Sequence, residues 1–88
     1  MEPKETVEKM TSADYKERFV AEYQQTKIRY EKLKHFCDRI EASQISKIEE
    51  PKHDCPLTLL IEQKDLMGQY LHVLELRAVL EDIDLGGM

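Results

Sequence analysis

Three polar side chains able to bind a ligand recur at intervals of seven residues, namely Gln63, Tyr70 and Arg77. Seven residues make nearly two turns of an α-helix, so these side chains should form one column along a helix. Arginine offers phosphate or carboxylate a planar fork of donors, tyrosine offers a ring and a hydroxyl, and glutamine both donates and accepts. The column therefore suits an anionic, aromatic ligand or a protein partner. The alternative is a polar network between copies of the chain, with Arg77 paired to a carboxylate.

Apolar residues accompany this column in two neighbouring stripes on the same segment. One stripe contains Leu57, Leu60, Met67, Leu71, Leu74 and Ala78, and the other contains Leu59, Leu66, Tyr70, Val73 and Leu80. A single partner helix covers one such stripe, so the second stripe predicts a further contact, most simply with another copy of the same chain.

A repeated His-x-Cys pattern, His35 with Cys37 and His53 with Cys55, would supply four residue types that bind zinc. On a helix, positions 35 and 37 point about 200° apart, and zinc ligands usually have two to four intervening residues for that reason. These four residues are the only candidates for a metal site. The pattern favours Cys37 as a core residue, His35 as a solvated neighbour and Cys55 as the start of a helix, and predicts no cofactor.

Catalytic motifs are missing from the chain, which has three histidines, no Gly-x-Ser-x-Gly turn and no glycine loop for phosphate. The carboxylates lie in charged runs that are expected to be exposed to solvent, so no pair of them is placed for general acid–base catalysis. The sequence therefore predicts a binding or structural protein and not an enzyme.

The composition describes one small domain of 88 residues with a formal net charge of −5. Such a chain is too short for a multidomain enzyme, and its negative charge disfavours general binding to nucleic acid or to anionic membranes. No apolar run is long enough to span a bilayer, and the N-terminus lacks the apolar core of a signal peptide. We therefore expect a cytoplasmic protein whose two cysteines are reduced.

The first half of the chain predicts one long helix. Residues 1–10 are polar and are expected to form a disordered leader, and Thr11 with Asp14 fits a capping box that starts a helix over 12–42. Apolar and small residues follow at alternating steps of four and three: Phe19, Tyr23, Thr26, Tyr30, Leu33, Cys37 and Ile40. Tyr30 follows Tyr23 by seven residues in this row, so both are expected at the core of the hairpin or at its edge. Tyr30 is a further candidate for ligand binding.

A linker is expected over 43–55, where Pro51 disfavours helical geometry at the residue before it. Ile45 and Ile48 lie inside this linker. They either extend the first helix by a turn or two or fold back as a small plug at the hairpin end.

The second helix is expected over 56–84, because proline is well tolerated at a first helical position and Gly86 and Gly87 suit a helix end. Residues 86–88 then form a tail, and residues 11–85 form the domain. The predicted fold is all-α, an antiparallel two-helix hairpin that oligomerises through its second helix.

Two segments, "DYKERFVAEYQQTKIRYEKLKHF" and, after a short linker, "CPLTLLIEQKDLMGQYLHVLELRA", resemble a family of small helical hairpins from phages and prophages. That family includes proteins of crAss-like phages and of phages of Gram-positive hosts. The resemblance covers about residues 14–85 and implies an accessory protein acting in the host bacterial cell.

The hairpin is also similar to phage anti-defence sponges, which assemble helical hairpins and sequester cyclic nucleotide immune signals. The similarity lies in Arg77-Ala78-Val79 with Gln69 a little over two turns earlier. It implies a homo-oligomer that counters bacterial immunity by binding either a cyclic nucleotide signal or a host immune protein. In the first case Arg77 would hold phosphate, Tyr70 would stack on a base and Gln63 would contact its edge. The alternative is a structural or assembly protein of a phage that binds no ligand.

Overall fold

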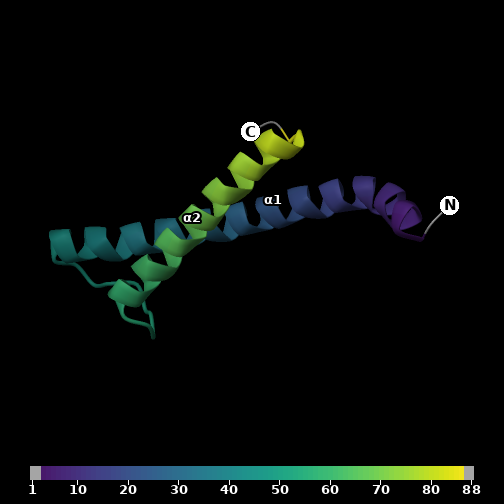
Figure 1. Cartoon of the computed structure of the whole chain (residues 1–88). Helices are drawn as coiled ribbons and strands as arrows, with labels where there is room; N and C mark the ends of the chain where they lie inside the picture. Colours follow the sequence, from purple (N-terminus) through teal and green to yellow (C-terminus); the bar gives the residue numbers. More distant parts are fainter. Residues whose placement is uncertain (1–2, 87–88) are drawn as a thin grey trace.

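The computed structural model describes the backbone of residues 3–86 and the side chains of residues 14–86. Helix α1 covers Pro3–Ser46 and helix α2 covers Leu57–Glu81, with no strand in the described range. Helix α2 runs back obliquely across α1 (Figure 1), so that Tyr15 meets Glu81 and Tyr23 meets Glu75. The predicted all-α antiparallel hairpin is confirmed.

Helix α1 begins earlier and ends later than the sequence predicted. It was expected over 12–42 after a disordered leader at 1–10, but the helix already begins at Pro3 and continues to Ser46. Proline is compatible with a first turn, and no glycine or further proline interrupts the segment before Pro51. Residues 1 and 2 lie outside the described range.

Helix α1 ends where Lys47 adopts a left-handed backbone conformation, with φ of 58°. The N–H of Ile48 then donates to the carbonyl of Ser43, at 3.0 Å, which satisfies one of the last helical acceptors. Ile45 is therefore the last apolar residue of the helix. Both Ile45 and Ile48 are exposed, so the structure supports a longer helix and not an apolar plug.

Helix α2 ends at Glu81, three residues before the predicted end at 84, and its first residue is Leu57 with Pro56 as the N-cap. Asp82 takes the left-handed position that the sequence assigned to glycine, with φ of 56°. The N–H of Ile83 donates to the carbonyl of Ala78 at 2.8 Å, and the Ile83 side chain turns back into the core. The burial of Ile83 fixes the helix end. Asp82 can occupy the left-handed position because aspartate tolerates this conformation better than most residues.

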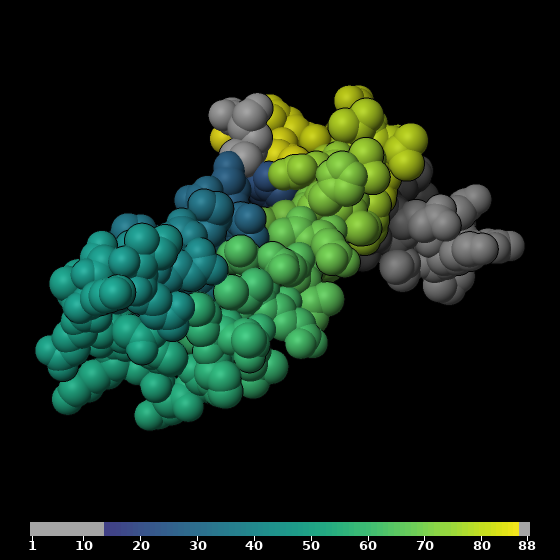
Figure 2. Space-filling model, turned by 90° about the vertical axis from the view of Figure 1, so that its left-hand side faces the viewer, coloured from purple at the N-terminus to yellow at the C-terminus, as the bar shows by residue number. Residues whose placement is uncertain are grey.

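The core is a single seam between the two helices. Its main cluster contains Phe19, Tyr23, Leu71, Leu74, Ala78 and Ile83. Cys37 and Ile40 are also buried, toward the hairpin end, where the last turns of α1 lie beside the start of α2 (Figure 2). Close packing between the helices depends on Gly68, because a Cβ there would lie 3.2 Å from the Cε1 atom of Tyr30.

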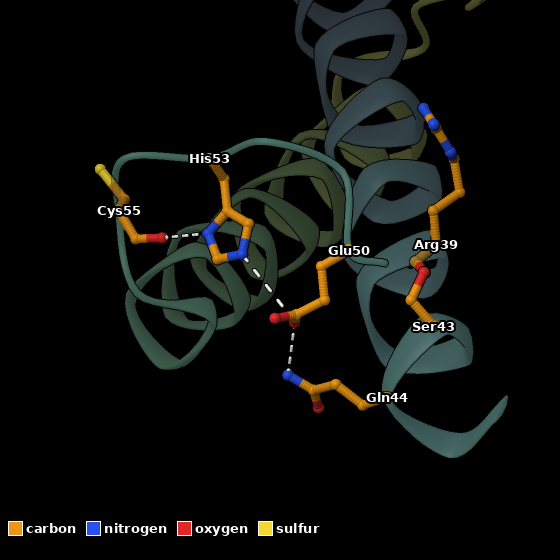
Figure 3. A network of polar contacts seen from close by, with 6 residues as sticks. All are labelled: Arg39, Ser43, Gln44, Glu50, His53 and Cys55. Carbon is orange, nitrogen blue, oxygen red and sulfur yellow. Dashed lines mark hydrogen bonds and ion pairs between the residues drawn. The ribbon is translucent and has the colours of Figure 1, made fainter. Parts of the chain in front are cut away.

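The connection between the helices is held by polar contacts around His53 (Figure 3). Its Nδ1–H donates to the carbonyl of Cys55 at 2.6 Å, and its Nε2 atom lies 4.0 Å from a carboxylate oxygen of Glu50. Gln44 of α1 donates to the same oxygen at 2.8 Å, so this carboxylate links helix and loop. The His53 ring also packs edge-on against Phe36. Neither described helix is long and apolar enough to cross a membrane.

Candidate functional site

Two tyrosine hydroxyls of α1 donate to glutamates of α2 across the seam. Tyr15 bonds Glu81 and Tyr23 bonds Glu75, each at 2.6 Å. Hydrogen bonds to charged acceptors are shorter and stronger than neutral ones, and these two fix the register of the helices along one side.

Arg77 takes part in the first of these contacts. Its Nε–H donates to Glu81 at 3.1 Å, an Nη2–H of the same guanidinium group donates to the hydroxyl of Tyr15, and its Cζ lies 5.1 Å from the centre of the Phe19 ring. The side chain is therefore fixed in place although 47% of its surface is exposed. An arginine has five N–H donors, so three remain for a ligand or partner.

Tyr70 forms the third tyrosine–carboxylate contact in the opposite sense, from α2 to α1. Its hydroxyl donates to Glu22 at 3.0 Å, and this bond raises the pKa of the phenol. Tyr70 remains 43% exposed. The ring therefore presents a positioned surface to solvent.

A groove of about 390 Å³ lies beside this ring, between α1 and α2, and we call it the Tyr70 groove. It is lined by Glu22, Thr26, Arg29, Leu33, Gln63, Met67 and Tyr70. Its volume falls in the range of about 300–1,000 Å³ that is typical of small-molecule sites.

The lining of the Tyr70 groove combines three kinds of group. Leu33 and Met67 supply apolar surface, Gln63 supplies a donor and an acceptor, and Arg29 supplies a cation. The Arg29 guanidinium has no ion-pair partner among residues 14–86. An aromatic face beside an unpaired arginine is suited to an aromatic anion.

A second hollow of about 300 Å³ continues from the groove onto the outer face of α2. It is lined by Leu59, Glu62, Gln63, Leu66, Met67 and Tyr70. Gln63, Met67 and Tyr70 border both hollows, so the groove opens toward the outer face of this helix.

That outer face is apolar and uncovered in the hairpin. We call its four residues at intervals of seven the outer column: Leu59, Leu66, Val73 and Leu80 are 53%, 57%, 49% and 85% exposed. Leu76 and Val79 are exposed beside the column. Exposed apolar surface of this kind marks an interaction site more often than a solvated face.

The structure brings together two of the ligand-binding candidates from the sequence. Gln63 and Tyr70 line one groove, whereas Arg77 lies further along the same face and contacts Tyr15 and Glu81. Gln69 is exposed and lines none of the described hollows around it.

Tyr30 lies apart from the Tyr70 groove. It lines a separate hollow of about 230 Å³, together with Tyr23 and Gly68. Sequence reasoning did not single out the two charged residues of the groove, Glu22 and Arg29. The one available signal was their spacing of seven residues, which places them on one face of the first helix.

The repeated His-x-Cys pattern does not form a metal site within the described part of the chain, where no three His, Cys, Asp or Glu side chains cluster. His35 is exposed while Cys37 is buried, because two residues apart on a helix they face opposite sides. Burial raises the pKa of the Cys37 thiol, which disfavours the thiolate that a metal needs. His53 already uses Nδ1 on the carbonyl of Cys55.

The contact between Glu81, Tyr15 and Arg77 predicts a loss of stability in acid. The hydrogen bond from Tyr15 and that from Arg77 lower the pKa of Glu81 below its ordinary value of 4.5. This contribution to stability is complete above pH 4.5 and is lost as pH falls through the lowered pKa. In melting curves from pH 7 to 3, Glu81→Gln should therefore show a weaker acid dependence than wild type. The exposed Glu17→Gln serves as control, and equal slopes for wild type and Glu81→Gln would contradict the assignment.

A second pH effect is expected in alkali. Burial and the bond to Glu75 raise the pKa of Tyr23 from 10.0 to about 12. The fold favours the neutral phenol, so its contribution to the free energy of unfolding is complete below pH 10. This contribution, up to about 2–3 kcal/mol, is lost as the pH rises from 10 to 12. Tyrosinate absorbance should show a late step that Tyr23→Phe removes and Tyr30→Phe retains. A late step that survives Tyr23→Phe would show that another tyrosine carries it.

Comparison with known proteins gives one family. A family model described as Sequestin matches residues 13–80, which include every residue lining the Tyr70 groove and the outer column. No curated protein matches the chain. No solved structure matches it either.

Proposed function

The chain belongs to the Sequestin family, and from this membership we propose that it is a non-enzymatic phage accessory protein that sequesters a cyclic nucleotide immune signal. The family name indicates a sequestering role. The ligand binds in the Tyr70 groove, and by holding the signal the protein lowers its free concentration in the host bacterial cell. Sequestration requires only affinity, so no residue has to perform covalent chemistry.

The observation that carries this proposal is the position of Tyr70 beside Arg29. Glu22 holds the hydroxyl of Tyr70, which leaves the ring half exposed and steady over the groove. A purine stacks on such a ring with a free energy of about 1–3 kcal/mol. Arg29 then meets a phosphate with its planar fork of donors, and Gln63 reads an edge of the base.

An assembly protein of a phage is the second candidate function, and the outer column favours it. A hairpin that only oligomerises needs its exposed apolar face but has no use for an unpaired arginine beside an aromatic ring. Binding of a nucleotide therefore separates the two functions.

Thermal unfolding with cyclic nucleotides tests the proposed function. The probes are cyclic AMP, cyclic di-AMP and cyclic ADP-ribose, which present one phosphodiester, two phosphodiesters and a pyrophosphate. A bound probe at about 100 times its Kd should stabilise the fold by about 2.7 kcal/mol, which raises Tm by roughly 10 °C or more.

Arg29→Ala should abolish most of this rise in Tm without changing the Tm of the free protein, since the side chain is exposed. Arg18→Ala, an exposed arginine of the same helix outside the groove, is the matched control and should retain the rise. No rise with any probe, or an equal rise in Arg29→Ala, would contradict the proposal.

A further inference from the structure

Glu22 is an unexpected lining residue for a groove that binds an anion. Its carboxylate lies at one end of the α1 wall of the Tyr70 groove, and Arg29 lies seven residues further along this wall, about 10 Å away along the helix axis. Among residues 14–86, the two side chains form no ion pair with each other. The groove therefore has a negative charge at one end and a separate positive charge further along.

The Glu22 carboxylate is held in this position by both helices. The hydroxyl of Tyr70 on α2 donates to its Oε2 atom at 3.0 Å. The hydroxyl of Thr26, a buried residue of α1, donates to the same atom at 3.5 Å. Turning the carboxylate away from the groove would break both contacts.

The second oxygen of this carboxylate is available to a ligand. Within residues 14–86, no donor is hydrogen-bonded to the Oε1 atom of Glu22, and the residue is exposed. An ionised carboxylate accepts hydrogen bonds on both oxygens and donates none. A ligand group that meets Oε1 must therefore be an O–H or N–H donor.

We propose that Glu22 is a specificity-determining residue of the Tyr70 groove: its Oε1 atom accepts a hydrogen bond from an O–H or N–H donor of the bound nucleotide, while Arg29 binds the phosphate. This inference rests on the proposed function, because the donor belongs to the sequestered ligand. Nucleotides carry such donors as ribose hydroxyls and as N–H groups of the base. The ligand is thus bound in one direction, with a donor at Glu22 and a phosphate at Arg29.

Charge fixes this direction. A phosphate placed beside Glu22 would meet a like charge at short range, which is unfavourable. A donor in the same place forms a hydrogen bond with a charged acceptor, which is stronger than one with a neutral acceptor. The carboxylate therefore disfavours the reversed ligand and any nucleotide that has no donor at this position.

A double-mutant cycle separates contact with the ligand from support of the Tyr70 ring. Glu22→Ala is prepared in wild type and in Tyr70→Phe, in which the hydroxyl that binds Glu22 is already absent. The probe is whichever of cyclic AMP, cyclic di-AMP and cyclic ADP-ribose wild type binds, and isothermal titration gives its affinity. In the Tyr70→Phe background, Glu22→Ala should still weaken binding by about 10- to 100-fold. No further loss in this background would show that Glu22 acts only by holding Tyr70, and would overturn the inference.

Glu41→Ala is the matched control for the change in net charge. Glu41 is an exposed glutamate of the same helix that does not line the groove, so its variant should keep the affinity of wild type. Equal changes in Glu22→Ala and Glu41→Ala would show that only the overall charge matters. That result, or a higher affinity in Glu22→Ala, would also overturn the inference.

Analogues of the bound probe identify the donor. Each analogue lacks one donor of the parent probe, either a ribose hydroxyl or an N–H of the base. The analogue without the contacting donor should bind wild type weakly, and Glu22→Ala should weaken it no further. If Glu22→Ala weakens every analogue as much as the parent probe, Glu22 accepts no bond from the ligand. If wild type binds no probe, the proposed function itself fails, whereas a bound probe that is indifferent to Glu22→Ala refutes this inference alone.

Discussion

Tyr70→Ala is expected to weaken binding of the cyclic nucleotide by about 10- to 100-fold, because stacking of a base on an aromatic ring contributes about 1–3 kcal/mol. The ring is half exposed and packs little apolar surface into the core, so the hairpin should still fold. Isothermal titration gives the affinity, and circular dichroism checks the helices.

Tyr70→Phe is the matched control for this prediction. It keeps the ring and removes only the hydroxyl that donates to Glu22, so its affinity should fall less than about tenfold. A Tyr70→Phe variant as weak as Tyr70→Ala would show that the hydroxyl and not the ring contacts the ligand. Equal affinity in wild type and both variants would place the ligand elsewhere.

Leu66→Glu is expected to prevent the self-association that the second apolar stripe of α2 predicts. In such an assembly this exposed position would be buried, and the contact would have to bury new carboxylates in an apolar surface. The cost of several kcal/mol should raise the Kd of self-association by more than about 100-fold. Sedimentation velocity over a range of concentrations measures the shift.

Ile28→Glu provides a close control for Leu66→Glu. Ile28 is 54% exposed and Leu66 is 57% exposed, so both substitutions place a carboxylate on an equally open helix surface. Ile28 lies on α1, away from the outer column, and its variant should keep the mass of wild type. An Ile28→Glu variant of lower mass than wild type, or a Leu66→Glu variant of the same mass as wild type, would contradict self-association through α2.

The fold follows from the spacing of apolar residues to a large extent. Phe19 and Tyr23 on one helix and Leu71 and Leu74 on the other were assigned to facing rows, and the structure buries all four in one cluster. Burial of these rows drives the two helices together, and a proline-containing linker of moderate length permits the antiparallel return.

The helix ends were harder to predict, because they depend on contacts distant in the sequence. Asp82 ends α2 although the sequence predicted that Gly86 and Gly87 would do so, because the end is fixed by the burial of Ile83 in the core. Helix α1 likewise begins at Pro3 and continues through Thr11 and Asp14, so the two residues that fit a capping box lie inside the helix. A local capping pattern therefore does not by itself decide where this helix begins.

The candidate site was predictable on one helix and not on the other. The interval of seven residues placed Gln63 and Tyr70 on one face of α2, and both line the groove. Arg29 looks like the other basic residues of α1 until packing sets it opposite Tyr70. The bond from Arg77 to Glu81 follows the usual spacing of four residues, whereas its contact with Tyr15 depends on how the hairpin closes.

The most direct test of sequestration follows the ligand instead of the protein. Wild-type protein is incubated with a cyclic nucleotide probe in slight deficit, free ligand is removed by ultrafiltration, and the retained fraction is heated and assayed by mass spectrometry. The account predicts that the probe is retained and is then released with its mass unchanged, and that Tyr70→Ala retains little of it. A probe that passes through the filter with wild type, or one released in cleaved form, would contradict the account.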